Sequence, residues 1–189
     1  SYLCCLPNFI VMAPSSGEEL KNMINFALSI NNKPSAIRYP RDIANEYKNN
    51  DKFQKIIMGK GKIIKNGKKI AFLNLGTRLK KISEITELIK KNYKLNCSII
   101  DMRFAKPIDT KLIQKLTKNH DIFVTIEENA IGGFSSQVND FLINKLSKTP
   151  KILNFFMKDE FIDQSDIEDQ YSKSGISPRI IYEKLIKVL

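Results

Sequence analysis

Short apolar runs alternate with helix-like patterns along most of this chain, and no other feature constrains its fold as strongly. Apolar residues recur at helical spacing between the runs. Strands separated by helices are typical of a mainly parallel sheet with helices on both faces. The sequence therefore predicts an α/β fold. The segments that we interpret as strands are "FIVMAP", "PSAIRYP", "IAFLNLG", "NCSIIDM", "DIFVTIEE" and "KILNFFM".

The first helical pattern begins after a pair of serines. Either Ser15 with Glu18 or Ser16 with Glu19 fits a capping box, in which a serine and a glutamate satisfy the free amides of a helix start. The helix lies between two strands, which we therefore expect to be parallel neighbours. The apolar positions that we place on one buried face of this helix are Leu20, Met23, Ile24, Ala27 and Leu28.

Asn66-Gly67 separates two runs of alternating apolar and polar residues. This dipeptide is the strongest short-range signal for a two-residue β-hairpin, because its residues tolerate positive φ angles. We expect the hairpin to add one antiparallel strand to the otherwise parallel sheet.

A loss of periodicity divides the chain into two units. We expect residues 1–46 to form a strand, a helix and a strand, and residues 56–189 to form a second and larger unit. Residues 47–55 are polar and without periodicity, so we interpret them as a linker.

Composition argues against several classes of partner. The net charge of +11 comes mostly from lysines scattered along the chain, with only five arginines, so we expect a solvated surface and no nucleic-acid partner. No run of 18 apolar residues is present, so we expect no membrane partner. Cys4, Cys5 and Cys97 form neither a disulfide framework nor a metal-binding spacing, and His120 is the single histidine. No metal ligand is therefore expected in this chain.

Arg38 and Arg41, in "AIRYPRD", are the strongest candidates for binding a ligand. They follow a predicted strand, at the edge of the sheet where α/β sites lie. The period of a strand places them on opposite faces, so we expect different roles. Pro40 favours an extended Tyr39, so that Arg41 is presented rigidly. Guanidinium groups bind carboxylate or phosphate, and the residues alone leave open which of the two is the target.

Three other residues are weaker candidates. We interpret His120 as a loop or helix-cap residue in preference to a catalytic one. Glu127 and Glu128 end a predicted strand just before Gly132-Gly133. The favoured interpretation is capping of the next turn and helix, or contact with another subunit. A functional carboxylate at the sheet edge is the alternative.

Four segments in this order resemble the carboxyl-terminal part of the 1-deoxy-D-xylulose-5-phosphate synthases, which are thiamine-diphosphate enzymes of the transketolase superfamily. The most specific are "DMRFAKPID" and "TIEENAIGGF"; "RYPR" alone is shared with other members. The segments are "LPNFIVMAPSSGEEL", "AIRYPR", "IIDMRFAKPID" and "TIEENAIGGF". The resemblance implies that residues 1–46 end a middle, pyrimidine-binding domain and that residues 56–189 form the transketolase carboxyl-terminal domain.

The same resemblance implies the activity and one site residue. The family condenses pyruvate with glyceraldehyde 3-phosphate and releases carbon dioxide. Its arginine for the substrate phosphate matches Arg41, whereas Arg38 and Tyr39 would be secondary or structural. Asp42 stands where the family usually has glycine, and it places a carboxylate beside Arg41 as a competitor.

The resemblance also implies what lies elsewhere. The ligands of thiamine diphosphate and Mg²⁺ are expected before Ser1, so we expect no catalytic and no cofactor-binding residue here. The partners would be the missing amino-terminal part and a second copy in a homodimer, in a relict plastid stroma or a bacterial cytoplasm. The alternatives are a 2-oxoacid dehydrogenase β subunit, a transketolase, and a non-enzymatic assembly or ligand-sensing domain.

Overall fold

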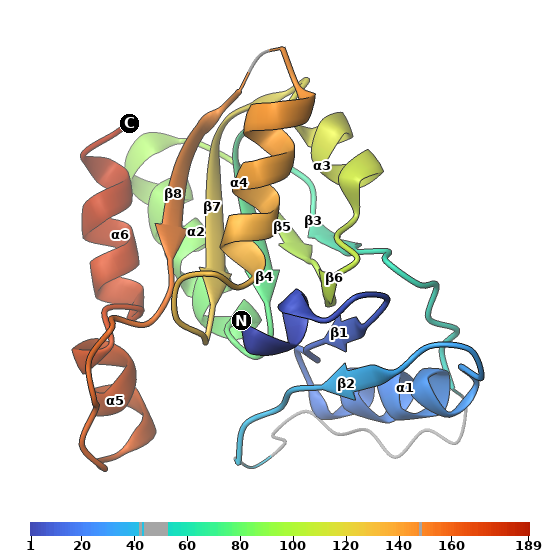
Figure 1. The fold of residues 1–189 in the computed structure, drawn as a ribbon. Helices are drawn as coiled ribbons and strands as arrows, with labels where there is room; N and C mark the ends of the chain where they lie inside the picture. Colours follow the sequence, from blue (N-terminus) through green and yellow to red (C-terminus); the bar gives the residue numbers. More distant parts are fainter. Residues whose placement is uncertain (42, 44–52, 148) are drawn as a thin grey trace.

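Two sheets organise the chain, one of five strands and one of three (Figure 1). The computed structural model describes residues 1–41, 43, 53–147 and 149–189. In chain order, the elements are η1 (Tyr2–Cys5), β1 (Ile10–Met12), α1 (Gly17–Leu28), β2 (Ser35–Ile37), β3 (Lys62–Lys65), β4 (Lys69–Leu75), α2 (Leu79–Tyr93), β5 (Ser98–Asp101), β6 (Phe104–Lys106), α3 (Thr110–Leu116), β7 (His120–Glu127), α4 (Phe134–Lys145), β8 (Lys151–Phe155), α5 (Ile167–Lys173) and α6 (Pro178–Ile186).

The larger sheet has the strand order β3-β5-β4-β7-β8. Strands β5, β4, β7 and β8 are parallel, and β3 is antiparallel to β5. Alternate residues of each strand point to opposite faces, so each face can bury its own set of apolar side chains. The predicted fold class, a mainly parallel α/β sheet with one antiparallel strand, is confirmed.

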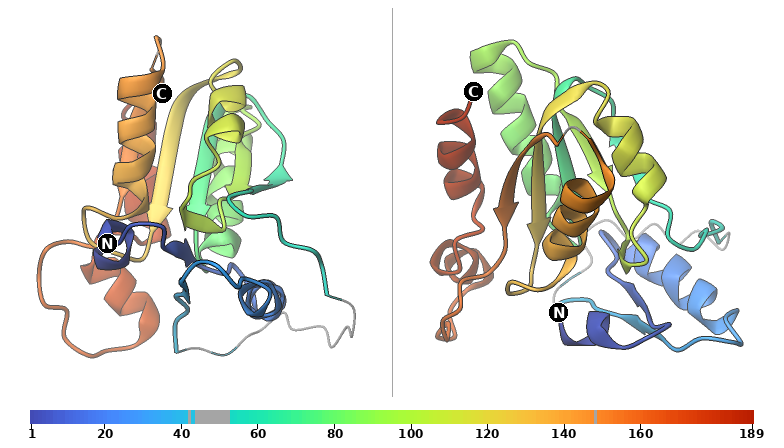
Figure 2. Two further views of the ribbon diagram at one scale, coloured as in Figure 1. Left: turned by 45° about the vertical axis from the view of Figure 1, so that its right-hand side comes forward. Right: turned by 45° about the horizontal axis from the view of Figure 1, so that its top comes forward.

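Helices cover both faces of this sheet (Figure 2). Helices α3 and α4 pack on the face that carries Leu73 and Phe123. Helices α2 and α6 pack on the face that carries Phe72 and Val124. Helix α2 buries Ile82, Ile85, Thr86 and Ile89, which recur at helical spacing, whereas Leu79 at its start is only partly buried.

The predicted hairpin at Asn66-Gly67 is wrong. Strands β3 and β4 are consecutive, but β5 lies between them in the sheet. A type I′ turn needs positive φ at both central residues, and neither Asn66 nor Gly67 has it; Lys69 does, with φ 65°. Gly67 instead passes against the start of β5, where its amide donates to Ser98 Oγ at 2.8 Å. The antiparallel strand exists, but its partner is β5.

The smaller sheet joins the two units. Its order is β2-β1-β6, with β1 and β2 parallel, as predicted, and β6 antiparallel to β1. Strand β6 comes from the larger unit, and its Phe104 packs with Met12 and Met23 of the smaller one. Val11 and Ala13 pack into the core of the larger sheet. The two units therefore share both a sheet and a core. The linker at residues 47–55 stays a prediction, because residues 47–52 lie outside the described residues.

The predicted buried face of α1 is partly wrong. Met23 is buried and Ala27 packs against the core, but Ile24 and Leu28 are 46% and 78% exposed. The helix is rotated because its buried face carries two polar residues, Glu19 and Asn22. Both have partners that the hydrophobic pattern could not indicate: Arg103 Nη2 for Glu19, at 2.6 Å, and the Gln54 amide for Asn22, at 2.9 Å.

Only half of the capping box forms. Ser16 is the N-cap of α1, and its hydroxyl accepts a hydrogen bond from the Glu19 amide at 3.2 Å. The Glu19 carboxylate does not return the bond, because it pairs with Arg103. Ser15 donates instead to Asp101 Oδ2 of the larger unit.

Candidate functional site

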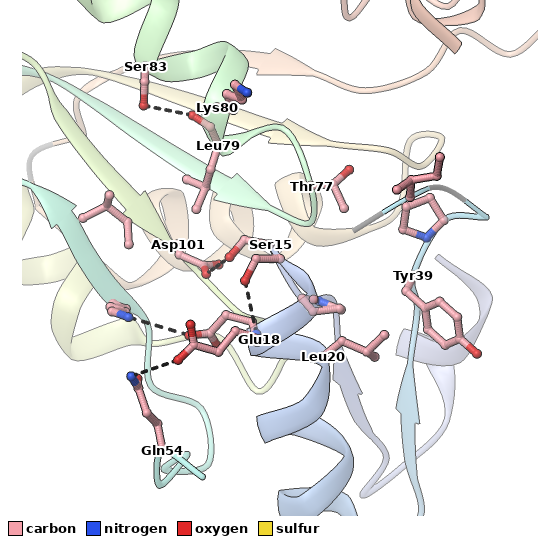
Figure 3. Close-up of a pocket in the computed structure, with 18 of the residues that line it drawn as sticks. Ser15, Glu18, Leu20, Tyr39, Gln54, Thr77, Leu79, Lys80, Ser83 and Asp101 are labelled. Carbon is pink, nitrogen blue, oxygen red and sulfur yellow. Dashed lines mark hydrogen bonds and ion pairs between the residues drawn. The ribbon is translucent and has the colours of Figure 1, made fainter. Parts of the chain in front are cut away.

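A cavity of about 800 Å³ lies between the two units, where strands of both sheets end (Figure 3). Ser15 follows β1, Arg41 follows β2, Thr77 follows β4, and Asp101 ends β5. Figure 3 shows Ser15 and Asp101 facing each other, with Tyr39 on one side and the start of α2 on another. The carboxyl ends of strands are where α/β folds place ligands. The cavity is therefore the candidate site.

Arg41 lines this cavity and is exposed. Within the described residues, it forms no ion pair and no hydrogen bond, so its guanidinium is available to an anion in the cavity. Asp42, the expected competitor, lies outside the described residues. The site residue proposed from the sequence is thus placed where a ligand could reach it.

Arg38 pairs with the carboxylate of Glu128 and lines another cavity than Arg41 does. Its Nη1 lies 2.5 Å from Glu128 Oε2, and its side chain lines a second cavity of about 380 Å³. Tyr39 lies between the two arginines, is 60% exposed and lines both cavities. The two arginines therefore point to different surroundings, and Arg38 has an internal carboxylate as its partner.

Glu128 receives three side-chain donors from three parts of the chain. Besides Arg38, Thr77 Oγ1 donates to Glu128 Oε1 at 2.5 Å, and the Tyr171 hydroxyl donates to the same oxygen at 3.0 Å. Glu128 is only 5% exposed. Burial and the neighbouring Glu128 charge raise the pKa of Tyr171 above its usual value. The Arg78 guanidinium lies over the Tyr171 ring, 3.6 Å from its centre.

Glu127 caps helix α4, which confirms the capping interpretation for this residue. Its carboxylate accepts hydrogen bonds from the amides of Phe134 and Ser135, both at 2.8 Å, and from the Ser135 hydroxyl at 2.7 Å. Gly133 leaves the room for this, because a Cβ at that position would lie 2.2 Å from Glu127 Oε2. Glu128 is not a cap, since it pairs with Arg38 of the smaller unit.

Asp101 also lines the cavity between the two units, and it was not among the residues expected from the sequence. It is fully buried, accepts a hydrogen bond from Ser15 Oγ at 2.5 Å and one from the Arg103 amide at 3.2 Å. Burial, opposed mainly by the Ser15 hydrogen bond, raises the pKa of Asp101 to about 6. The signal that could have revealed it is the one used for Arg38: a charged residue at the carboxyl end of a strand.

His120 is structural. It is buried at the start of β7, with Nδ1 2.7 Å from the Leu116 carbonyl oxygen and Nε2 2.9 Å from Ser98 Oγ. Both ring nitrogens are thus hydrogen-bonded inside the fold, at the amino end of the strand and away from the cavity. The interpretation of His120 as non-catalytic agrees with these contacts, although it belongs to a strand and not to a loop.

In the part of the chain that the structure describes, no group of three or more His, Cys, Asp or Glu side chains could hold a metal ion. Among the same residues, no helix has the length and apolar character needed to cross a membrane.

The fold matches that of a solved transketolase-type chain. The chain superposes on "Split gene transketolase, inactive beta4 tetramer" with a TM-score of 0.80 at 22% identity, covering 98% of this chain and 58% of that one. At this identity the likeness concerns the fold alone. The chain therefore has a transketolase-like α/β fold.

The sequence places the chain in a family. The profile of the family described as "Transketolase, C-terminal domain" matches residues 59–181, so the chain belongs to the transketolase carboxyl-terminal domain family. It is similar to "1-deoxy-D-xylulose-5-phosphate synthase" of Blochmanniella floridana, with 39% identity over 99% of this chain and 30% of that protein. The Psychromonas ingrahamii protein of the same name is 38% identical over 96% of this chain and 29% of its own length.

A plant relative has a similar relationship. "Probable 1-deoxy-D-xylulose-5-phosphate synthase 2, chloroplastic" of Oryza sativa subsp. japonica is 35% identical over all of this chain and 27% of its own length. The chain thus spans less than a third of the length of these curated relatives.

Proposed function

We propose that this chain is the carboxyl-terminal part of a thiamine-diphosphate-dependent transferase that makes 1-deoxy-D-xylulose 5-phosphate. The enzyme would condense pyruvate with glyceraldehyde 3-phosphate and release carbon dioxide. Support comes from the names of the relatives, each similar to this chain over at least 96% of its length. The activity belongs to the longer polypeptide, because these relatives are more than three times as long as the region they share with this chain.

Arg41 is the residue of this chain that would touch substrate. The observation that carries this assignment is its exposed guanidinium, which lines the cavity between the units without a partner among the described residues. A guanidinium forms two parallel hydrogen bonds to a phosphate, which suits the terminal phosphate of glyceraldehyde 3-phosphate. Pyruvate carries no phosphate, so Arg41 would discriminate between the two substrates.

Thiamine diphosphate would supply the electron sink for the decarboxylation of pyruvate, and Mg²⁺ would bind its diphosphate. The described residues do not fit the metal, since they contain no cluster of three or more His, Cys, Asp or Glu side chains that could hold Mg²⁺. The ligands of thiamine diphosphate and Mg²⁺ are proposed to lie in the preceding part of the polypeptide, and this chain alone is expected to be inactive with cofactor and Mg²⁺ supplied.

Substitution of Arg41 tests the proposal in the full-length enzyme. Arg41→Ala should raise KM for glyceraldehyde 3-phosphate much more than KM for pyruvate. Loss of a charge-assisted bidentate contact costs about 1.5–3 kcal/mol, or roughly 10- to 150-fold in kcat/KM. Arg41→Lys should restore only part of the activity, because an ammonium keeps the charge and loses the fork.

Arg38→Ala removes the other arginine of the segment and keeps the Arg41 side chain itself. It should lower the melting temperature, because it leaves the buried Glu128 without its cation. Equal KM values for the phosphate substrate in Arg41→Ala and the wild type would contradict the role of Arg41. Absence of pyruvate decarboxylation by the full-length protein in the presence of glyceraldehyde 3-phosphate would contradict the reaction itself.

We also propose a homodimer, located in a plastid stroma or a bacterial cytoplasm. The location is supported by the relatives, of which two are bacterial and one is named chloroplastic. Sedimentation of the full-length protein would test the dimer, and a tagged copy viewed in cells would test the location.

A further inference from the structure

We infer that Glu128 is a positioning residue for Arg41 and acts through Arg38. This inference rests on the proposed function, because it concerns the presentation of Arg41 to a phosphate. It assigns to a residue of the larger unit, distant in sequence, a part in binding the phosphate-bearing substrate.

Glu128 lies at the point of the sheet where α/β folds usually bind ligands. From β4 the chain continues to β5 on one side, and later strands β7 and β8 follow on the other side. The strand order therefore reverses between β4 and β7, and the crevice at the carboxyl ends of these two strands is the usual ligand position. Thr77 follows β4 and Glu128 follows β7. Here, the crevice receives the side chain of Arg38.

The Glu128 carboxylate makes Arg38 costly to displace. A buried carboxylate is destabilising unless a cation and hydrogen bonds compensate it. Thr77 and Tyr171 supply hydroxyl donors to Oε1, and Arg38 supplies the cation at Oε2. The side chain of Glu128 is 2% exposed, whereas that of Arg38 is 45% exposed. The carboxylate is thus built into the larger unit, and Arg38 binds it from the smaller one.

Arg38 is held by its backbone as well as by its side chain. Its amide donates to the Met12 carbonyl oxygen at 2.9 Å, which extends the pairing of β2 with β1 by one residue. The segment leaves the sheet at this point, and only Tyr39 and Pro40 separate Arg38 from Arg41. Pro40 has a fixed φ and restricts Tyr39, so the segment transmits the orientation of Arg38 to Arg41.

Arg41 has no comparable anchor of its own. Its guanidinium makes no ion pair within the described residues, so the Arg38–Glu128 pair is the last fixed point before the phosphate ligand. Loss of this pair should let Arg41 move by an amount that matters for binding, since a misplacement of about 1 Å can cost up to 100-fold. A pair that served stability alone would not affect one substrate more than the other.

The test uses the full-length enzyme with Glu128→Gln. This substitution keeps the side-chain shape and removes the charge that holds Arg38. We expect KM for glyceraldehyde 3-phosphate to rise about tenfold, within the range of coupling between contacting residues. KM for pyruvate should change less than about twofold. The rise in KM should disappear in an Arg41→Ala background, because the Arg38–Glu128 pair then has no arginine to position.

Arg103→Gln is the matched control. Arg103 also forms an ion pair across the two units, with Glu19 at 2.6 Å, but it lies next to β6 and not on the 38–41 segment. This variant should lower the melting temperature without selective change in the KM of the phosphate substrate. Tyr171→Phe, which removes one donor to Glu128, should raise that KM by about two- to threefold, and it serves if Glu128→Gln fails to fold.

A second measurement does not depend on activity. Amide hydrogen exchange of a peptide that covers residues 36–43 should become faster in Glu128→Gln and stay unchanged in Arg103→Gln. Unchanged exchange of this peptide in Glu128→Gln would overturn the inference that Glu128 holds the segment. A phosphate-substrate defect in Arg41→Ala without one in Glu128→Gln would overturn this inference and leave the proposed function intact. Absence of the defect in Arg41→Ala itself would overturn the proposed function, while the exchange data would still decide whether Glu128 fixes the segment.

Discussion

At the scale of single residues, three buried carboxylates are stabilised in three different ways. Glu127 accepts from the first amides of α4, whose helix dipole also favours a negative charge. Glu128 has the cation of Arg38. Asp101 has only one hydroxyl and one backbone amide as donors, and the nearby Glu19 charge opposes its ionisation further. Of these three carboxyl groups, Asp101 is therefore the one whose charged form has no cation or helix start to stabilise it.

The raised pKa of Asp101 predicts a pH dependence of stability. Its pKa is about 6 in the folded chain and 3.8 as the ordinary value, so the folded state binds more protons between these values. The free energy of unfolding should therefore fall as the pH rises from about 4 to 6, and then level off. The loss is on the order of 3 kcal/mol, at 1.36 kcal/mol per pKa unit.

Asp101→Asn supplies the comparison. Asparagine keeps an oxygen that can accept the Ser15 hydrogen bond but cannot ionise. The difference in unfolding free energy between the variant and the wild type, measured by urea denaturation, should grow in favour of the variant between pH 4 and 6. A constant difference across this range would show that Asp101 has an ordinary pKa.

At the scale of secondary structure, the segment between β3 and β4 depends on close approach and not on a turn type. A Cβ on Gly67 would lie 2.2 Å from the Asn96 carbonyl oxygen and 2.4 Å from the Cys97 carbonyl carbon. Both contacts involve backbone, which cannot swing away as a side chain can. The glycine is therefore required because the loop crosses the start of β5.

This geometry predicts different effects at the two positions of the dipeptide. Gly67→Ala should destabilise the chain by about 3 kcal/mol, at the upper end of the usual cost of overpacking. Asn66→Ala should change stability by less than about 0.5 kcal/mol, since Asn66 is exposed. Thermal denaturation of both variants checks this. A large cost at Asn66 would instead support the hairpin turn that the sequence suggested.

At the scale of the whole molecule, the two units are held together by contacts of several kinds. Strand β6 of the larger unit pairs with β1, and apolar residues of the smaller unit complete the larger core. Among the described residues, three ion pairs cross the boundary: Arg38–Glu128, Arg103–Glu19 and Lys62–Glu19. The smaller unit therefore contributes to the stability of the larger one.

Removal of residues 1–46 tests how far the larger unit is independent. Residues 56–189 should still fold cooperatively, because their five-stranded sheet is covered on both faces. Their melting temperature should be lower than that of the complete chain, since Glu128 and Arg103 lose their ion-pair partners and the larger core loses Val11 and Ala13. Circular dichroism melts of the complete chain and of residues 56–189 would measure the difference. Equal melting temperatures would contradict the shared core, and loss of cooperativity would contradict the boundary.

Much of the fold could be predicted because local patterns determine it. The strands of the larger sheet are apolar runs whose side chains alternate between two helical layers, and α2 buries apolar residues from Ile82 to Ile89 at helical spacing. The capping roles of Ser16 and Asp109 are also local, since each side chain accepts from an amide three residues later. Such features depend on neighbours in sequence, which periodicity can report.

The α/β class, most of the elements and the transketolase resemblance thus follow from the sequence alone, and the family match confirms the resemblance. Four features depend on long-range contacts: β3 pairs with β5, β6 joins β1, α1 turns Glu19 inward, and Arg38 pairs with Glu128. Each of these is a contact between residues distant in the chain, and the favourable energy of pairing a charge or burying a strand edge there outweighs the local preference.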